Sequence, residues 1–185
     1  MDRPSPPVVA LVLNWNCADD TQQCVAALRR STYPSLQILV LDNASTGCCL
    51  FLRGTALQRI DLFDERYFLY FEDVDLSRRL ANAGFAVGVC VRTAVTHRET
   101  HPTTLPSPRS AYYLVRNSLL LFSEHAAEHG VSRHAVTARL LHRHLLNLRS
   151  VAALIRRDPV AVASFRGVRD FFSGHFGPSR FMWNR

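Results

Sequence analysis

The chain has 185 residues, of which 48% are hydrophobic, and a formal net charge of +7. This composition is globular and excludes a disordered protein, and the longest apolar runs (8–13 and 119–122) are far shorter than the ~20 residues of a membrane-spanning helix. The five cysteines include no C-x-x-C pair, which indicates reduced, mostly buried thiols rather than a disulfide scaffold. We therefore expect a cytoplasmic protein with one buried core.

The chain opens with an apolar run at 8–16 (VVALVLNWN), which is typical of a parallel strand covered on both faces. A helix is expected to begin at Asp19 or Asp20, and a second apolar strand spans 36–45. Strand, helix and strand together span about 34 residues, the usual size of a βαβ unit. Both strands end in polar residues, and ligands of open α/β sheets bind beyond such carboxyl ends.

Four further elements are predicted before a loop rich in Pro and Thr at 93–108. We expect a strand at 47–53, a short helix at 55–60, a helix at 72–83 and an alternating strand at 85–92. The helix at 72–83 has Leu76 and Leu80 on one side, and Gly84 is expected to end it. From residue 111 onward the sequence reads as helical.

The stretch YFLYFEDVDL (67–76) places three carboxylates directly behind four aromatic rings. One interpretation is capping, because acidic side chains at a helix start are stabilised by unpaired N–H groups and by the helix dipole. The other is proton transfer, because apolar surroundings raise the pKa of a carboxyl group toward the range of a general base. Asp73 and Asp75 point about 200° apart on a helix, which excludes joint chelation of one ion. Asp75 is expected to pair with Arg78 or Arg79.

The positive charge is concentrated in the last third of the chain. Residues 126–185 hold 10 arginines against 3 acidic residues, whereas residues 1–125 hold 12 of each. Within 132–157 the apolar residues share one helical face: Val136, Leu140, Leu141, Leu145, Leu148, Ala152 and Ile155. This pattern suits either a helix on an anionic membrane surface or a helix packed on its own domain. Nucleic acid is a poorer choice of partner, since no recognised fold accompanies the arginines.

Three segments resemble glycosyltransferase family 2, the inverting enzymes of GT-A type, and most closely their bacterial rhamnosyltransferase-like branch. They are VVALVLNWN through LVLDNAST (8–46), LFLRG through VTHRE (50–99), and YYLVRNSLLL (112–121). The resemblance implies an α/β fold of the GT-A-like (Rossmann-like) kind, with a mostly parallel sheet flanked by helices. This fold would be incomplete and would be followed by a C-terminal helical extension. The expected domains are a glycosyltransferase domain at 1–125, internally shortened near 46–49, and a basic helical extension at 126–185.

The same resemblance implies roles for individual residues. Asp73 would be the catalytic base that deprotonates the acceptor hydroxyl, His97 would help to hold a divalent cation, and the nucleotide-sugar or acceptor would contact Asn14, Trp15, Asn16, Asp42 and Glu72. Arg116 and Asn117 match an RN pair of this branch to which we assign no role. From the residues alone, a single loop histidine such as His97 is more often merely exposed, Trp15 can be an ordinary packing residue, and Asp42 with Asn43 can be only a turn.

The family's metal-binding D-x-D motif is absent between Asp42 and Asp64. A doubly wound domain needs several βα units of ~30 residues each, and only one precedes this point, so a segment on the order of 100 residues is expected to be missing. The cofactor implied by the resemblance is Mn²⁺ or Mg²⁺. The implied partners are a dTDP- or UDP-linked sugar donor, rhamnose among the candidates, and a lipid-linked or polysaccharide acceptor of the cell envelope, with a peripheral contact at the inner face of the cytoplasmic membrane. We expect poor transfer by this chain; the alternative is a non-catalytic remnant that binds membrane or protein.

Overall fold

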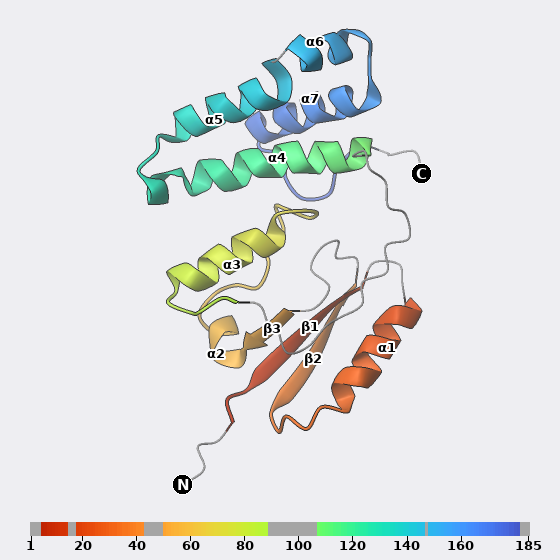
Figure 1. Cartoon of the computed structure of the whole chain (residues 1–185), viewed down its shortest axis with the longest axis vertical. Coiled ribbons are helices and arrows are strands. Elements are labelled where there is room, and N and C mark those ends of the chain that lie inside the picture. The colour runs from red at the N-terminus through yellow and green to blue at the C-terminus, as the bar shows by residue number, and fades with distance from the viewer. Residues whose placement is uncertain (1–4, 15–17, 43–49, 89–106, 147, 182–185) are drawn as a thin grey trace. The chain divides into compact units, whose positions relative to one another are not determined.

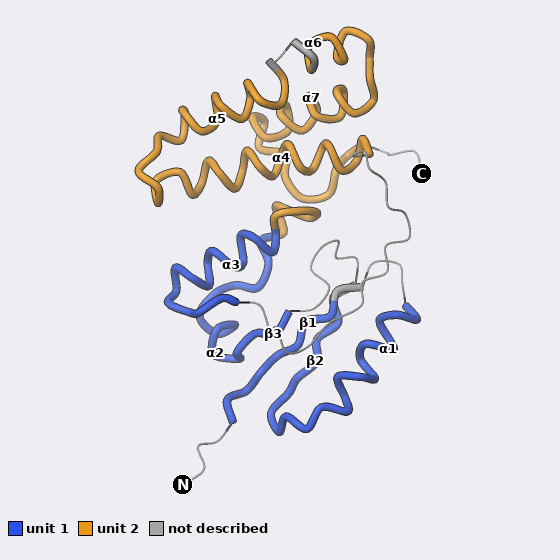
Figure 2. The backbone as a smooth tube through the Cα atoms, in the orientation of Figure 1, with its two compact units in different colours: residues 1–64, 72–99 blue, residues 65–71, 100–185 orange. Residues whose placement is uncertain are grey.

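A computed structural model describes residues 5–14, 18–42, 50–88, 107–146 and 148–181. The chain forms two compact units, which Figure 2 shows in two colours. Unit 1 comprises residues 1–64 and 72–99, and unit 2 comprises residues 65–71 and 100–185. The short segment 65–71 therefore packs with the C-terminal helices, although its neighbours on both sides in the sequence belong to unit 1. The division expected at residue 125 stays a prediction, because packing units alone do not define family domains.

Unit 1 contains a three-stranded sheet in the order β2-β1-β3 (Figure 1). The strands β1 (Val8–Asn14) and β2 (Leu36–Asp42) run parallel, joined by the helix α1 (Ala18–Arg29), while β3 (Leu50–Arg53) runs antiparallel to β1. The central strand β1 is the most apolar, and its residues Val9 to Val12 are buried as expected for a strand with neighbours on both edges. The expected α/β class with a helical C-terminal part is confirmed, and the small sheet is mixed.

Two helices complete the core of unit 1. The short helix α2 (Gly54–Leu57) follows β3, and α3 (Glu72–Asn82) buries Leu76 and Leu80 against Val9 and Leu11 of β1. Gly84 ends α3 with a φ of +84°, and the N–H of Phe85 bonds to the carbonyl of Leu80 at 3.0 Å. This six-to-one bond around a left-handed glycine is a Schellman cap, so the predicted stop is confirmed.

The strand expected at 85–92 is not formed in its first half. Residues 85–88 have no regular secondary structure, and residues 89–92 lie outside the described part of the chain. The side chain of Phe85 packs against the apolar cluster of unit 1 instead of pairing along a sheet edge. Burial of this aromatic ring next to the helix stop thus outweighs the β propensity of the alternating sequence.

Unit 2 is helical and is organised around α4 (Pro108–Glu124) and α7 (Pro159–Phe172), which pack side by side (Figure 1). Both helices begin with a proline behind a side-chain cap: Ser107 accepts from the N–H of Ser110, and Asp158 accepts from two N–H groups of α7. Between them lie four shorter segments, η1 (Ala126–His129), α5 (Arg133–Leu141), the π-helical η2 (His142–Leu146) and α6 (Leu148–Ile155). No described helix is long and apolar enough to cross a membrane.

The basic stretch 132–157 is interrupted, where the sequence suggested continuous helix. A π-helical turn separates α5 from α6, and Leu140, Leu141 and Leu145 pack against a buried cluster of α4 and α7. Ile155, from the same predicted face, is 77% exposed. The middle of the face is therefore covered by the protein itself, as in the second of the two interpretations, and its C-terminal end is open to solvent.

Gly167 allows the close approach of α7 to α4, and its replacement tests this packing. A Cβ atom at Gly167 would lie 2.6 Å from the carbonyl oxygen of Tyr112 and 3.3 Å from the nitrogen of Arg116. Gly167→Ala should therefore destabilise the chain by about 1–3 kcal/mol, although alanine ordinarily stabilises a helix interior by ~1 kcal/mol. Gly88→Ala, whose Cβ would meet nothing within 4 Å, is the control. Urea unfolding followed by circular dichroism measures both, and equal midpoints would contradict the close contact.

Candidate functional site

The carboxyl ends of the two parallel strands meet as the sequence predicted. Asn14 and Asp42 are register partners, the last residues of β1 and β2. In Figure 1 these strand ends and the first turn of α3 both lie toward the upper end of unit 1. The side chains of Asn14 and Asp42, together with Trp15, Asn16 and His97, lie outside the described residues. Their roles stay predictions, as does the proximity of Asp73 to Asp42.

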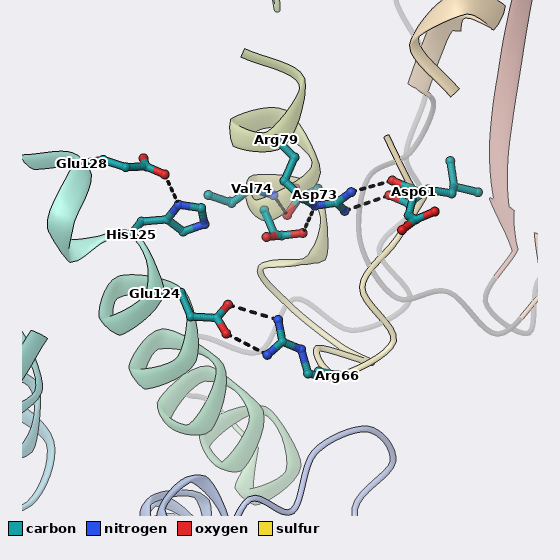
Figure 3. Close-up of polar contacts among 10 residues, drawn as sticks. Asp61, Arg66, Asp73, Val74, Arg79, Glu124, His125 and Glu128 are labelled. Carbon is teal, nitrogen blue, oxygen red and sulfur yellow. Dashed lines mark hydrogen bonds and ion pairs between the residues drawn. The ribbon is translucent and has the colours of Figure 1, made fainter. Parts of the chain in front are cut away.

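Asp73 occupies the first turn of α3, where its carboxylate is half-buried. Its Oδ1 accepts the N–H of Val74 at 2.8 Å (Figure 3). This bond partly satisfies the helix start, as the capping interpretation proposed. The other oxygen has no assigned role in the cap, so the capping and catalytic interpretations are compatible for this residue.

Glu72 is the acid that the fold removes from water. Glu72 is only 8% exposed, and neither of its carboxylate oxygens has a hydrogen-bond partner among the residues that the structure describes. Burial raises the pKa of Glu72 to about 7; its own backbone N–H opposes this rise and the charge of Asp73 adds to it. A carboxyl group with a pKa near neutrality can both hold and release a proton under physiological conditions. The sequence argument about aromatic surroundings therefore applies to Glu72, one residue before the acid singled out by the resemblance.

Asp75 has a structural role on the opposite side of the same turn. Its Oδ2 accepts the Nε of Arg79 at 2.7 Å, and the guanidinium also donates to the backbone carbonyls of Asp61 and Leu62 (Figure 3). The ion pair predicted one turn along the helix is confirmed. Arg79 thereby ties α3 to the loop that precedes residue 65.

The segment 65–71 leads into these acids and has an unusual backbone. Phe68, Tyr70 and Phe71 have φ angles of 60°, 66° and 72°, although none of them is glycine. The left-handed region costs a residue with a Cβ atom roughly 1–2 kcal/mol. Tyr67, before them, and Leu69, between Phe68 and Tyr70, are buried and anchor the segment in unit 2. A conformation of this cost persists only where the surroundings determine it.

Arg116 and Asn117, fully buried in α4, supply those surroundings. Asn117 Nδ2 lies 2.8, 2.7 and 3.0 Å from the carbonyl oxygens of Tyr67, Leu69 and Tyr70, and Arg116 donates to the carbonyls of Arg66 and Tyr67 at 3.0 and 3.1 Å. The guanidinium also bonds to the carbonyl of Gly177 and lies over three aromatic rings, those of Tyr112, Tyr113 and Phe176. The sequence showed the RN pair but could not show what it holds, because its partners are about 50 residues away.

A divalent cation finds no ready-made site in the described part of the chain. The described ranges contain no group of three His, Cys, Asp or Glu side chains that could hold a metal ion. His97 lies outside them, so the cation stays a prediction.

Comparisons with known proteins connect part of the chain to one enzyme. Over 58 residues it is 43% identical to the N-acetylglucosaminyl-diphospho-decaprenol L-rhamnosyltransferase of Mycobacterium tuberculosis, in both the CDC 1551 and H37Rv strains. The match covers 31% of this chain and 19% of each relative, so the chain spans about a fifth of the curated proteins that it matches. No family model matches the chain, and no solved structure gives a significant match. Part of the chain is thus glycosyltransferase-like in sequence.

Burial of Glu72 predicts a pH dependence of stability that a single substitution should remove. Because the pKa is about 7 in the folded chain against 4.5 for the free side chain, folding takes up a proton between these values. The free energy of unfolding should therefore fall as pH rises from 5 to 7, by at most about 1.4 kcal/mol per pH unit, and level off above. In Glu72→Gln this component should vanish. Urea midpoints between pH 5 and 8 compare the two chains, and parallel profiles would mean that Glu72 is solvated.

Proposed function

We propose that this chain derives from, and acts as part of, a glycosyltransferase that transfers a sugar from a nucleotide-sugar to an acceptor in cell-envelope glycan synthesis. The observation that carries the proposal is the 43% identity to a rhamnosyltransferase over 58 residues. The family 2 and inverting GT-A assignments belong to the same proposal and rest on the resemblance of the motifs. The α/β unit with polar strand ends and the acid pair in the first turn of α3 are compatible with it.

In the proposed reaction Asp73 takes the proton of an acceptor hydroxyl while that oxygen bonds to the anomeric carbon of the donor sugar. The bond from this carbon to the nucleoside diphosphate breaks, and the leaving diphosphate carries away the electron pair. Glu72 would adjoin the acceptor, and a direct contact requires its buried carboxylate to become accessible when the acceptor binds. Asn14, Trp15, Asn16 and Asp42 would bind the nucleotide at the strand ends, and His97 would hold the cation whose charge offsets that of the diphosphate.

The name of the related enzyme suggests the two substrates. A decaprenol-linked N-acetylglucosaminyl diphosphate would be the kind of acceptor and an activated rhamnose the kind of donor. A dTDP- or UDP-linked sugar meets both requirements of the proposed donor site, a base and ribose for the strand ends and a diphosphate as the leaving group. A lipid-linked acceptor would also bring the enzyme to a membrane surface.

Sugar transfer by the chain and by two carboxylate variants tests the proposal. We expect slow transfer by the 185-residue chain, and faster transfer once a middle segment with a D-x-D is inserted near 46–49. In that restored enzyme, Asp73→Asn should lower kcat by about 10²–10⁴ without weakening nucleotide binding. Asp19→Asn, which changes an exposed acid in the first turn of α1, should leave kcat unchanged. Equal loss in both variants would remove Asp73 from the mechanism.

A peripheral membrane contact is proposed for the open end of the basic segment. Ile155 and Val151 of α6 are 77% and 40% exposed, and Arg156 and Arg157 follow directly. Arginines near an anionic bilayer contribute ~1 kcal/mol each, and this attraction fades with salt. The chain should co-sediment with anionic liposomes at low salt and less at high salt. Ile155→Ser should weaken sedimentation, whereas Val87→Ser, also at an exposed valine, should not; identical behaviour of the two variants would argue against the contact.

A further inference from the structure

The bonds from α4 to segment 65–71 are directed at the backbone, which makes them independent of the aromatic side chains that the segment carries. Asn117 donates to three carbonyls within four residues of the segment, and since its amide has two N–H groups, at least one N–H is shared between carbonyls. Arg116 adds the carbonyls of Arg66 and Tyr67. The pair therefore determines the course of the backbone without bonding to the rings of the segment.

The residues with left-handed backbone are the ones whose rings are not fully buried. Tyr67 and Leu69 are buried, while Phe68, Tyr70 and Phe71 are half-buried and have positive φ. Each of these three rings is held by contacts with α4, among them Phe68 with the ring of Tyr113, Tyr70 with the hydroxyl of Ser110, and Phe71 with the ring of Phe122. A strained backbone thus presents three partly accessible rings in fixed places.

An ion pair at the start of the segment also holds its backbone in place. Arg66 forms two bonds to the carboxylate of Glu124, at 2.7 and 3.1 Å (Figure 3), and its backbone carbonyl accepts from Arg116 and from the N–H of Gly177. The segment is therefore held at Arg66 and again at Tyr70. Its next residue in the chain after Phe71 is Glu72, so the held segment ends where the acid pair begins.

We propose that Arg116 and Asn117 are positioning residues for the acceptor sugar: they hold segment 65–71 in its left-handed conformation so that its half-buried rings form an apolar surface of unit 2 on which the sugar packs. This inference rests on the proposed function and deepens it, since it names the side chains in α4 that shape that surface. A pyranose ring has an apolar face that packs on aromatic rings, and such packing requires the rings to be preorganised. Neither Arg116 nor Asn117 needs to touch the sugar itself.

The test compares Asn117→Asp with Ser118→Ala in the full chain. The aspartate keeps the shape of the side chain but cannot donate, so it loses all three bonds to the segment. Ser118 is the next residue of α4 and is also buried, and its hydroxyl donates to the carbonyl of Val115 in the same helix. Arg116→Lys keeps a cation among the rings and loses part of the bonds, which provides a milder second variant should the aspartate prevent folding.

Two readouts are measured under conditions where circular dichroism shows the chains to be folded. Chymotrypsin should cut after residues 67–71 about ten times faster in Asn117→Asp than in the wild-type chain, with Arg116→Lys between them and Ser118→Ala unchanged. The acceptor KM should rise on the order of tenfold in Asn117→Asp, less in Arg116→Lys, and not at all in Ser118→Ala. The KM for the nucleotide-sugar should stay constant in all three variants.

Each other outcome has a definite meaning. Equal cutting rates in Asn117→Asp and Ser118→Ala would show that the pair does not hold the segment. Faster cutting with an unchanged acceptor KM would restrict the pair to a structural role and overturn the proposal. A wild-type chain that transfers no sugar, even with its middle segment restored, would remove the proposed function and the acceptor role with it, while the cutting rates would still decide whether the pair holds the segment.

Discussion

The buried carbonyl groups of segment 65–71 impose the constraint on which unit 2 depends. A segment without helical or sheet partners must find donors elsewhere, and Arg116 and Asn117 supply them in five bonds. Three left-handed residues cost roughly 3–6 kcal/mol at 1–2 each, and five hydrogen bonds contribute about 2.5–7.5 kcal/mol. The two quantities are of the same size. The conformation of the segment therefore depends on both side chains of α4.

The guanidinium of Arg116 can occupy this position only because the helices around it come close. Gly167 lets α7 approach the backbone of α4 at Tyr112 and Arg116. Tyr112 in turn donates to the buried carboxylate of Asp170 at 2.8 Å, and burial raises the pKa of Tyr112 to about 12, so that its hydroxyl stays a donor. The helical unit is thus built around one buried cation, its aromatic neighbours and a hydrogen-bonded carboxylate.

The acid pair at the start of α3 separates two properties of a catalytic carboxylate, a raised pKa caused by burial and access to solvent. Glu72 is buried and lacks good hydrogen-bond partners, while Asp73 is half-buried and caps the helix. The resemblance assigns the base to Asp73, whereas the desolvation that favours proton exchange acts on Glu72. Adjacent acids in unlike surroundings are suited to different tasks, one accepting a proton and the other holding one.

The sequence by itself determined the α/β class, the βαβ start, the stop of α3 at Gly84 and the pairing of Asp75 with an arginine one turn along the helix, because each follows from local periodicity or from contacts within a few residues. It also gave both acids of the candidate site. Only the tertiary structure decided that Glu72 is the buried acid, that residues 85–88 form no strand, that part of the basic stretch packs inward, and that Arg116 and Asn117 hold segment 65–71. These outcomes depend on burial and on partners about 20 to 70 residues away, which no local pattern of residues encodes.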